Sequence, residues 1–349
     1  MAGELPEIDF RRVRLQSLAS RHSKVGLADF GRPLEAGSSL RDFASGLPNI
    51  LAAGDLKEAS GRIARAACDG RAVMLAMGGH PVKVGLGPVI CDLLRRNVLT
   101  SVSTNGSVMV HDAEVALAGA TSEDVDAGLG AGDFGVTRET GELVNLAVGR
   151  AAREGRGLGR CLGEAILEAG APHADKSVLA TAARLDKLMT VHVAVGGDVY
   201  HIHPDCRGDE LGAATMNDFR LFCRQTAALD RGVFLNLGSA VIMPEVFLKA
   251  LTLTRNMGFQ VDGLTTVNMD FVKQYRPSVN VVERPTRGGG RGYTFIGHHE
   301  IMFPLLMSLV LEELASPGAG GGSGGEGGEA GEDKGPGQAG GSPGGTDGR

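Results

Sequence analysis

Glycine and small polar residues interrupt the apolar sequence at four points, and each interruption could contact a ligand. They lie at 78–80, 104–107, 196–198 and 238–240, and each follows a short apolar run. Such a run that ends in glycine is typical of a buried strand followed by a turn, where the backbone can approach a phosphate closely. One such turn is ordinary in an α/β protein. Four of them with polar residues favour a site of dinucleotide size.

Two further groups of residues could carry acid–base or ion-pair chemistry. His111 and Asp112 follow the second turn, and an imidazole beside a carboxylate is a plausible proton-transfer pair. Residues 284–293 place Arg287, Arg291 and Tyr293 among glycines. Arginines on such a loop suit a phosphate or carboxylate, so we interpret the loop as an anion-binding lid, with a solvated surface loop as the alternative.

The histidines at 201 and 203 have a spacing that metal sites use. No third ligand follows at a diagnostic spacing, so no metal is expected, and loop histidines that contact substrate are the preferred interpretation. On this interpretation His203, together with Asp198 in the third turn, binds substrate. The histidines before Glu300 are expected to be polar N-terminal residues of the last helix.

The elements that must position these residues alternate between strands and helices. Five apolar runs predict strands: those at 72–77, 189–195, 232–237 and 260–267, and one that ends near 103. Helical periodicity is seen near 55–68, 138–153, 158–169, 212–229, 243–257 and 300–314. Successive βα units predict an α/β fold, a single Rossmann-like, doubly wound and mostly parallel sheet. We expect an N-terminal arm at 1–50, one domain at 51–315 and a disordered glycine-rich tail at 316–349.

Composition narrows the class of protein. The formal charge of −6 argues against a nucleic-acid partner. The five cysteines are widely spaced and include no C-x-x-C pair, which fits reduced thiols. The N-terminus lacks the apolar core of a signal peptide, and no apolar run is long enough to span a bilayer. A cytoplasmic protein without a membrane partner is therefore expected.

The order of these turns resembles deoxyhypusine synthase and its bacterial relatives over roughly residues 50–315. Residues 102–107, VSTNGS, are similar to the family's T-T-A-G-G turn, and 237–242, LGSAVI, to its L-G-G-G-V-V turn. The stretch 266–271, TVNMDF, resembles the family's N-T-A-Q-E-F cofactor segment. Its R-P dipeptide and its F-P-L-L sequence recur at 284–285 and 303–306. The segment from Ser177 to Asp198 is similar to a family segment that begins with S-V and leads into a polar strand end.

The departures from the family concern its reaction. The catalytic lysine falls at Tyr293, and a phenol cannot form the imine that the family uses. The histidine that helps to hold spermidine is replaced by Pro244, and an acid that would bind an ammonium group falls at Arg287. The resemblance therefore implies that the fold and the NAD site are kept, while deoxyhypusine synthesis is absent.

Together these observations predict an NAD-dependent enzyme that oxidises or rearranges a small anionic substrate. The resemblance also implies a homotetramer with sites between subunits. His111 and Asp112 or Tyr293 would transfer protons, and Asp198, His203, Arg287 and Arg291 would bind substrate. The expected cofactor-binding residues are Gly78, Gly79, His80, Gly85, Thr104, Asn105, Gly106, Gly238, Ser239, Thr266, Asn268 and Asp270.

Three other functions stay open at this point. Aminobutyl transfer, as in deoxyhypusine or homospermidine synthases, could use Lys273 or another lysine in place of the missing one. The chain could instead be a non-catalytic nucleotide sensor whose tail contacts partners. A metal-dependent hydrolase built on His201 and His203 is the third alternative.

Overall fold

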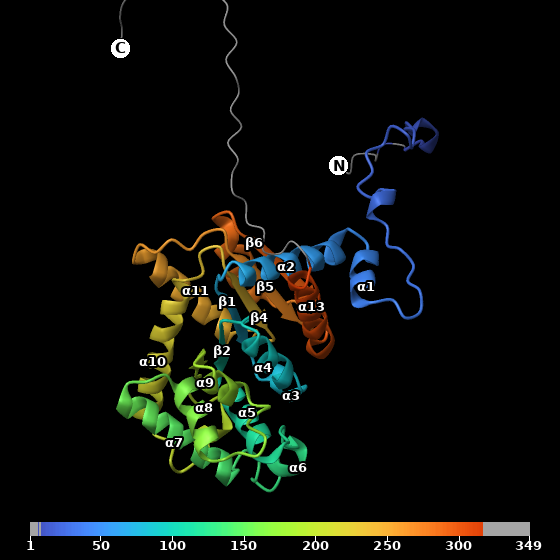
Figure 1. The fold of residues 1–349 in the computed structure, drawn as a ribbon. Helices are drawn as coiled ribbons and strands as arrows, with labels where there is room; N and C mark the ends of the chain where they lie inside the picture. The colour runs from blue at the N-terminus through green and yellow to red at the C-terminus, as the bar shows by residue number, and fades with distance from the viewer. Residues whose placement is uncertain (1–5, 7, 317–349) are drawn as a thin grey trace, which may run out of the picture.

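A six-stranded parallel sheet forms the centre of the protein (Figure 1). The computed structural model describes residues 6 and 8–316. The strands are β1 (Val73–Met77), β2 (Ser101–Asn105), β3 (Leu188–His192), β4 (Val233–Leu237), β5 (Thr265–Asp270) and β6 (Arg291–Ile296). Their order is β3-β2-β1-β4-β5-β6, and every neighbouring pair is parallel. The predicted α/β class and doubly wound sheet are confirmed.

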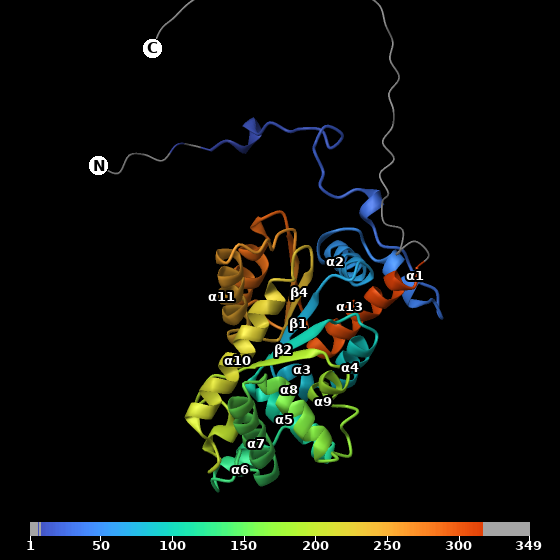
Figure 2. The same ribbon diagram turned by 60° about the vertical axis from the view of Figure 1, so that its left-hand side comes forward.

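Helices cover both faces of this sheet (Figure 2). They are α1 (Leu40–Gly46), α2 (Leu51–Cys68), α3 (His80–Lys83), α4 (Gly87–Arg95), α5 (Gly106–Ala118), α6 (Val125–Leu129), α7 (Arg138–Glu154), α8 (Leu158–Glu168), α9 (Val178–Arg184), α10 (Gly208–Thr226), α11 (Ile242–Asn256), α12 (Tyr275–Pro277) and α13 (His299–Leu314). In the part of the chain that the structure describes, none of these is both long and apolar enough to cross a bilayer.

Strand β1 shows why the central strands consist of continuous apolar residues. Val73, Leu75 and Met77 point into a core shared with α2, α4 and α13, whereas Met74 and Ala76 point into a second core with α10 and α11. Successive side chains of a strand face opposite sides, so a strand covered on both faces needs apolar residues at every position. The run is therefore apolar throughout instead of alternating.

Three elements differ from the sequence-based expectation. One is β5, which was expected at 260–267 and spans Thr265–Asp270. Helix α5 begins at Gly106, directly after β2, so that the predicted turn at 104–107 is a strand end followed at once by a helix. Strand β6 lies partly within the segment expected to be a flexible glycine loop. It forms because Tyr293 and Phe295 are buried and the strand pairs along its whole length with β5.

The N-terminal segment lies outside this core. Residues 8–39 run away from the sheet (Figure 2), and the apolar side chains of Phe10 and Leu15 are 82% and 92% exposed. Helix α1 is joined to α13 by an ion pair between Arg41 and Glu312 at 3.0 Å. The tail predicted at 316–349 lies outside the described residues except for Ser316.

The close approach of β1 and β4 can be tested with two alanine substitutions. A Cβ atom at Gly78 would lie 2.4 Å from the carbonyl oxygen of Gly238, and backbone cannot move aside as a flexible side chain can. Gly78→Ala should lower the free energy of unfolding by about 2 kcal/mol or more, measured by urea denaturation. Gly61→Ala is the matched control, because nothing lies within 4 Å of its Cβ position inside α2. It should raise stability by about 0.5–1 kcal/mol. Equal effects at both positions would contradict the packing described here.

Candidate functional site

The carboxyl ends of β1 and β4 lie side by side at the point where the strand order reverses. The chain leaves β1 toward α4 on one face of the sheet, and leaves β4 toward α11 on the other. The Gly78 amide donates to the Leu237 carbonyl at 3.1 Å. Gly238 has a φ of +62°, a conformation that side chains disfavour. Such a switch point is where open α/β sheets bind ligands.

Buried polar atoms without protein partners gather at this edge. The Asn236 amide donates to Asn268 at 2.8 Å and to the Ser239 carbonyl at 2.9 Å, but Asn236 Oδ1 and Asn268 Nδ2 have no partner among the described residues. The fully buried His299 ring lies over Gly238, and its Nε2 is 3.7 Å from Asp270. An unpartnered buried polar group costs about 1–3 kcal/mol, so this edge is suited to bind an additional polar group.

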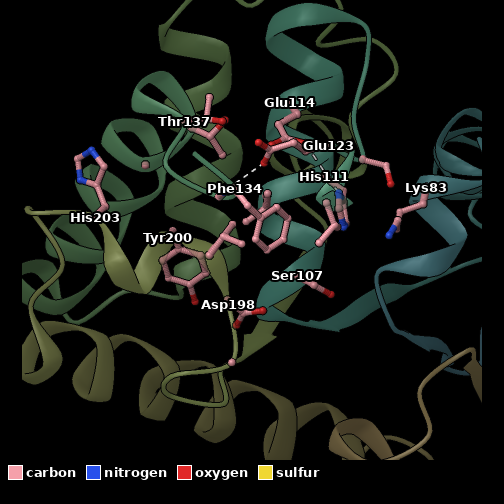
Figure 3. Close-up of a pocket in the computed structure, with 18 residues that line it drawn as sticks. Lys83, Ser107, His111, Glu114, Glu123, Phe134, Thr137, Asp198, Tyr200 and His203 are labelled. Atoms are coloured by element: carbon pink, nitrogen blue, oxygen red, sulfur yellow. Dashed lines mark hydrogen bonds and ion pairs between the residues drawn. The ribbon is translucent and has the colours of Figure 1, made fainter. Parts of the chain in front are cut away.

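A pocket of about 170 Å³ opens beside this switch point (Figure 3). Its walls come from α5, α7, the segment around α6 and the loop after β3. It is joined to the β1 turn because a Cβ at Gly79 would lie 2.5 Å from Ser107 Oγ and 3.3 Å from His111 Cδ2. Its polar lining residues are Lys83, Ser107, His111, Glu114, Ser122, Glu123, Thr137, Thr140, Asp198, Tyr200 and His203.

His111 is held in one orientation by a chain of hydrogen bonds. The Thr121 hydroxyl donates to Glu114 at 2.5 Å and lies 2.8 Å from His111 Nδ1. The hydroxyl has a single proton, which goes to Glu114, so His111 Nδ1 must donate to the hydroxyl oxygen. In the neutral ring, Nε2 is therefore the nitrogen that accepts a proton. An oriented histidine of this kind can act as a general base.

The carboxylate of Glu114 stays ionised in this arrangement. Burial raises its pKa, but hydrogen bonds with His111 and Thr121 outweigh burial, and the net pKa lies below the ordinary value of 4.5. Through the Thr121 hydroxyl this carboxylate fixes the orientation of the imidazole, whose Nδ1 lies 3.8 Å from Glu114 Oε2. Glu114 is therefore a positioning residue for His111.

Asp198 forms the opposite wall of the pocket, against the beginning of α5. A Cβ at Gly106 would lie 1.9 Å from Asp198 Oδ2 and 3.0 Å from the Tyr200 hydroxyl. Only glycine leaves room for both groups there. Burial raises the pKa of Asp198 to about 6, although the nearby His111 opposes this shift. The Tyr200 hydroxyl is buried and has no partner among the described residues.

The segment between α5 and α7 covers the pocket. The amide of Gly135 donates to Glu123 at 2.9 Å, which holds Phe134 over the opening. Figure 3 shows Phe134 between Tyr200 and His111. The glycines at 132 and 135 have φ values of +81° and +76°. This segment forms a lid.

The expectation for Asp112 was wrong. It is fully buried and faces away from His111, because adjacent residues of a helix point in different directions. Its carboxylate accepts from Ser177 Oγ at 2.5 Å and from the amides of Val178 and Leu179 at 2.8 and 3.0 Å. Asp112 therefore anchors the beginning of α9 and does not form an acid–base pair with His111.

The structure also separates the arginine–tyrosine segment from the pocket. Arg291 is opposite Thr265, the first residue of β5, so it lies at the amino edge of the sheet, and Arg287 precedes it. Tyr293 is buried in the middle of β6, and burial raises its pKa to about 12. Ligand-binding turns lie at the opposite, carboxyl edge. The two arginines that were expected to bind an anion, and the tyrosine that was expected to transfer a proton, are thus not at this site.

His203 lies in the pocket, whereas His201 turns toward its own loop. His201 Nδ1 accepts from the amides of Gly196 and Asp198, each at 3.2 Å. The His203 ring packs on Gly141 of α7. No group of three or more metal-ligating side chains is brought together within residues 6 and 8–316.

The other predicted cofactor residues divide into two groups. Those at the carboxyl edge are Gly78, Gly79, His80, Asn105, Gly106, Gly238, Ser239, Asn268 and Asp270. Thr104 and Thr266 are buried within β2 and β5, and Gly85 lies between α3 and α4 with a φ of +82°. None of these twelve residues is among those that line the pocket, which lies beside this edge.

Sequence reasoning missed Lys83, Ser107, Glu114, Thr121, Glu123 and Tyr200. A signal for two of them was present. Ser107, His111 and Glu114 are spaced i, i+4 and i+7, which places them on one face of a helix. The signal was hidden because residues 104–107 were interpreted as a turn and not as the start of a helix. The other four come together through tertiary contacts alone.

Comparisons with known proteins give similarity at the level of the backbone. No family model and no curated protein matches the sequence. Among solved structures, a protein assigned as deoxyhypusine synthase from Entamoeba histolytica is 11% identical, with a TM-score of 0.48, over 81% of this chain and 96% of that one. The ternary complex of AgrE with ornithine and NAD+ is 12% identical, with a TM-score of 0.48, over 74% of this chain and 33% of AgrE.

A conserved protein assigned as LOR/SDH from Methanococcus maripaludis S2 is 12% identical, with a TM-score of 0.44, over 74% of this chain and 69% of that one. This chain spans about a third of the length of the AgrE structures that it matches. These identities are too low to transfer any residue's role.

The separate roles of neighbouring Asp112 and His111 can be measured by stability. Asp112→Asn places an amide against three hydrogen-bond donors and should lower the free energy of unfolding by about 3 kcal/mol. His111→Gln should change it by less than about 1 kcal/mol, because the ring borders the pocket. Urea denaturation of both variants checks this. A larger loss at His111 than at Asp112 would reverse the assignment.

The raised pKa of Asp198 predicts a titration within the pocket. Its carboxyl group should be ionised above pH 6 and neutral below it. The pocket therefore loses one negative charge as the pH falls through 6. Carbon-13 NMR of aspartate-labelled protein should show one carboxyl resonance with a midpoint near 6, absent in Asp198→Asn. A midpoint near the ordinary value of 3.8 would show that Asp198 is solvated.

Proposed function

We propose that this chain is an NAD-dependent enzyme that binds the dinucleotide across the switch point between β1 and β4 and acts on a small substrate in the His111 pocket. The observation that carries the proposal is the strand order, which numbered along the chain reads 3-2-1-4-5-6. This is the order of dinucleotide-binding α/β sheets, in which the ligand lies where the order reverses. Here the reversal falls between the glycine turns at 78–79 and 238–239.

The residues at the switch point fit a dinucleotide in two respects. Gly78, Gly79 and Gly238 let the two strand ends pack closely, because a Cβ at each position would meet Gly238, Ser107 or His299, and such close packing is one role of glycines in dinucleotide-binding turns. The unpartnered amide atoms of Asn236 and Asn268 offer an acceptor and a donor to polar groups of the ligand. The pocket of about 170 Å³ lies beside this edge and suits a small substrate.

Hydride transfer to or from a substrate carbon is the chemistry that NAD supplies when bound. Oxidation of an alcohol or amine also releases a proton from the attached oxygen or nitrogen. His111 Nε2 is the base that accepts this proton, since Thr121 and Glu114 fix the tautomer. Glu114 then stabilises the protonated ring, and the lid with Phe134 excludes water from the pocket.

The pocket favours a substrate with a cationic group. The sequence pointed to an anionic substrate because of Arg287 and Arg291, but these lie at the other edge of the sheet. Three carboxylates, Glu114, Glu123 and Asp198, line the pocket against one lysine. Opposite charge stabilises a bound ammonium group, so an amine is the substrate class that this lining supports.

A second candidate is group transfer through a lysine imine. Lys83 at the pocket wall supports it, because a primary amine there could form the imine that Tyr293 cannot. Lys273, the earlier candidate, follows β5 and is not among the pocket-lining residues. Figure 3 shows Lys83 across the pocket from Asp198, on the side of His111.

Titration with NADH tests the dinucleotide site. The chain has no tryptophan, so enhanced NADH fluorescence reports the cofactor directly without interference from the protein. Phe271 follows β5 at the carboxyl edge and is 50% exposed. Phe271→Ala should weaken NADH binding about tenfold, the loss expected from one aromatic contact with the ligand.

Phe259 provides a matched control for this test. It is also 50% exposed, but it precedes β5 at the amino edge. Phe259→Ala should leave NADH binding unchanged. Absence of binding by NADH and NADPH to the unmodified chain would refute the proposed function, and equal losses in both variants would refute the placement at the carboxyl edge.

A further inference from the structure

A second groove lies at the amino end of β3, at the opposite edge of the sheet from the His111 pocket. Its walls are the turn between α7 and α8, the turn between α9 and β3, and one side of α10. Helices α7, α8 and α10 pack together in the same part of the molecule (Figure 1). Five cationic side chains line the groove: Arg156, Arg160, Lys187, Arg220 and Arg224. Asp186 is the acidic residue that lines this groove.

Three of these cations have no carboxylate partner within the described residues. Lys187 Nζ donates to the neutral amide of Asn97 at 2.5 Å, and Arg220 contacts the Asn217 amide oxygen at 3.4 Å. No hydrogen bond or ion pair joins Arg224 to another described side chain. A concentration of unpaired positive charge is unexpected on a chain with a net charge of −6. Mutual repulsion of these groups is relieved by a bound anion.

The other two cations are fixed in place before any ligand binds. Arg156 Nη2 and Arg160 Nε both donate to Glu164 at 2.6 Å. Arg160 also donates to Asp186 at 2.5 Å, and Asp186 itself has a φ of +53°. The remaining guanidinium donors are thereby held in fixed directions.

The floor of the groove is also a built structure. The Asn217 amide donates to the carbonyls of Ala151 and Arg156 at 3.3 and 3.2 Å, which ties the α7–α8 turn to α10. Leu188 and Leu221 supply an apolar surface between the charged groups. A concave site with arginine forks at its rim and an apolar floor suits a small phosphorylated molecule better than a flat polymer.

We propose that this groove is a second ligand site that binds a small molecule with two or more phosphoryl groups. Arg220 and Arg224, one helical turn apart on α10, contact one phosphoryl group, and Lys187 and Arg160 contact the next. The site does not depend on the proposed enzymatic function, because it shares no residue with the switch point or the His111 pocket.

Isothermal titration calorimetry with inorganic pyrophosphate tests the proposal. The unmodified chain should bind pyrophosphate, and Arg224→Glu should weaken this binding by at least about tenfold, the loss expected for one charge-assisted hydrogen bond. Asp186→Asn should tighten it, since a negative charge next to the anion is removed. Arg65→Glu is the control for the change in net charge, because Arg65 lies on α2, outside the groove. This variant should bind pyrophosphate as tightly as the unmodified chain does.

Several outcomes would overturn the proposal. They are no binding of pyrophosphate up to about 5 mM, an equal loss in Arg65→Glu, or binding that is unchanged in Arg224→Glu. Tighter binding of an RNA oligonucleotide than of pyrophosphate, with the same variant dependence, would reassign the groove to a polymer. NADH titration of Arg224→Glu separates the two sites, because the switch-point site should be unaffected by this variant.

Discussion

The contact between the backbones of Gly78 and Gly238 is the constraint on which the rest of the structure depends. It brings the carboxyl ends of β1 and β4 together with no side chain between them. The helices that follow these strands then pass to opposite faces of the sheet, which creates the switch point. The unpartnered amides of Asn236 and Asn268 and the His111 pocket are both positioned relative to this contact.

Helix α5 joins stability to the candidate chemistry. One face presents Ser107, His111 and Glu114 to the pocket, while Asp112 on another face holds the beginning of α9. Because α5 starts directly after the last residue of β2, its register is fixed by the sheet. The position of His111 is therefore set by packing on the side of the helix that faces away from the ligand. A rigid element of this kind is a suitable support for a base.

Much of the fold followed from local pattern, and less of the site did. Apolar runs located β1 and β4 closely, because both strands are buried on both faces. The glycines around β6 concealed a strand, since burial of Tyr293 and Phe295 depends on neighbours distant in sequence. His111, Asp198 and His203 were named in advance and lie in one pocket. Thr121 and Tyr200 carried no local signal, because their roles arise from contacts across the fold.

The sequence by itself determined the α/β class, the glycine-edged turns and the residue types available for proton transfer. These properties follow from periodicity and composition, which act between near neighbours along the chain. Only the tertiary structure decided that Glu114, through Thr121, orients His111 while Asp112 anchors a helix. It also decided that Arg287 and Arg291 lie at the edge opposite the pocket. The physical reason is that strand order and helix phase fix which edge and which face a side chain occupies, and neither is encoded in local spacing.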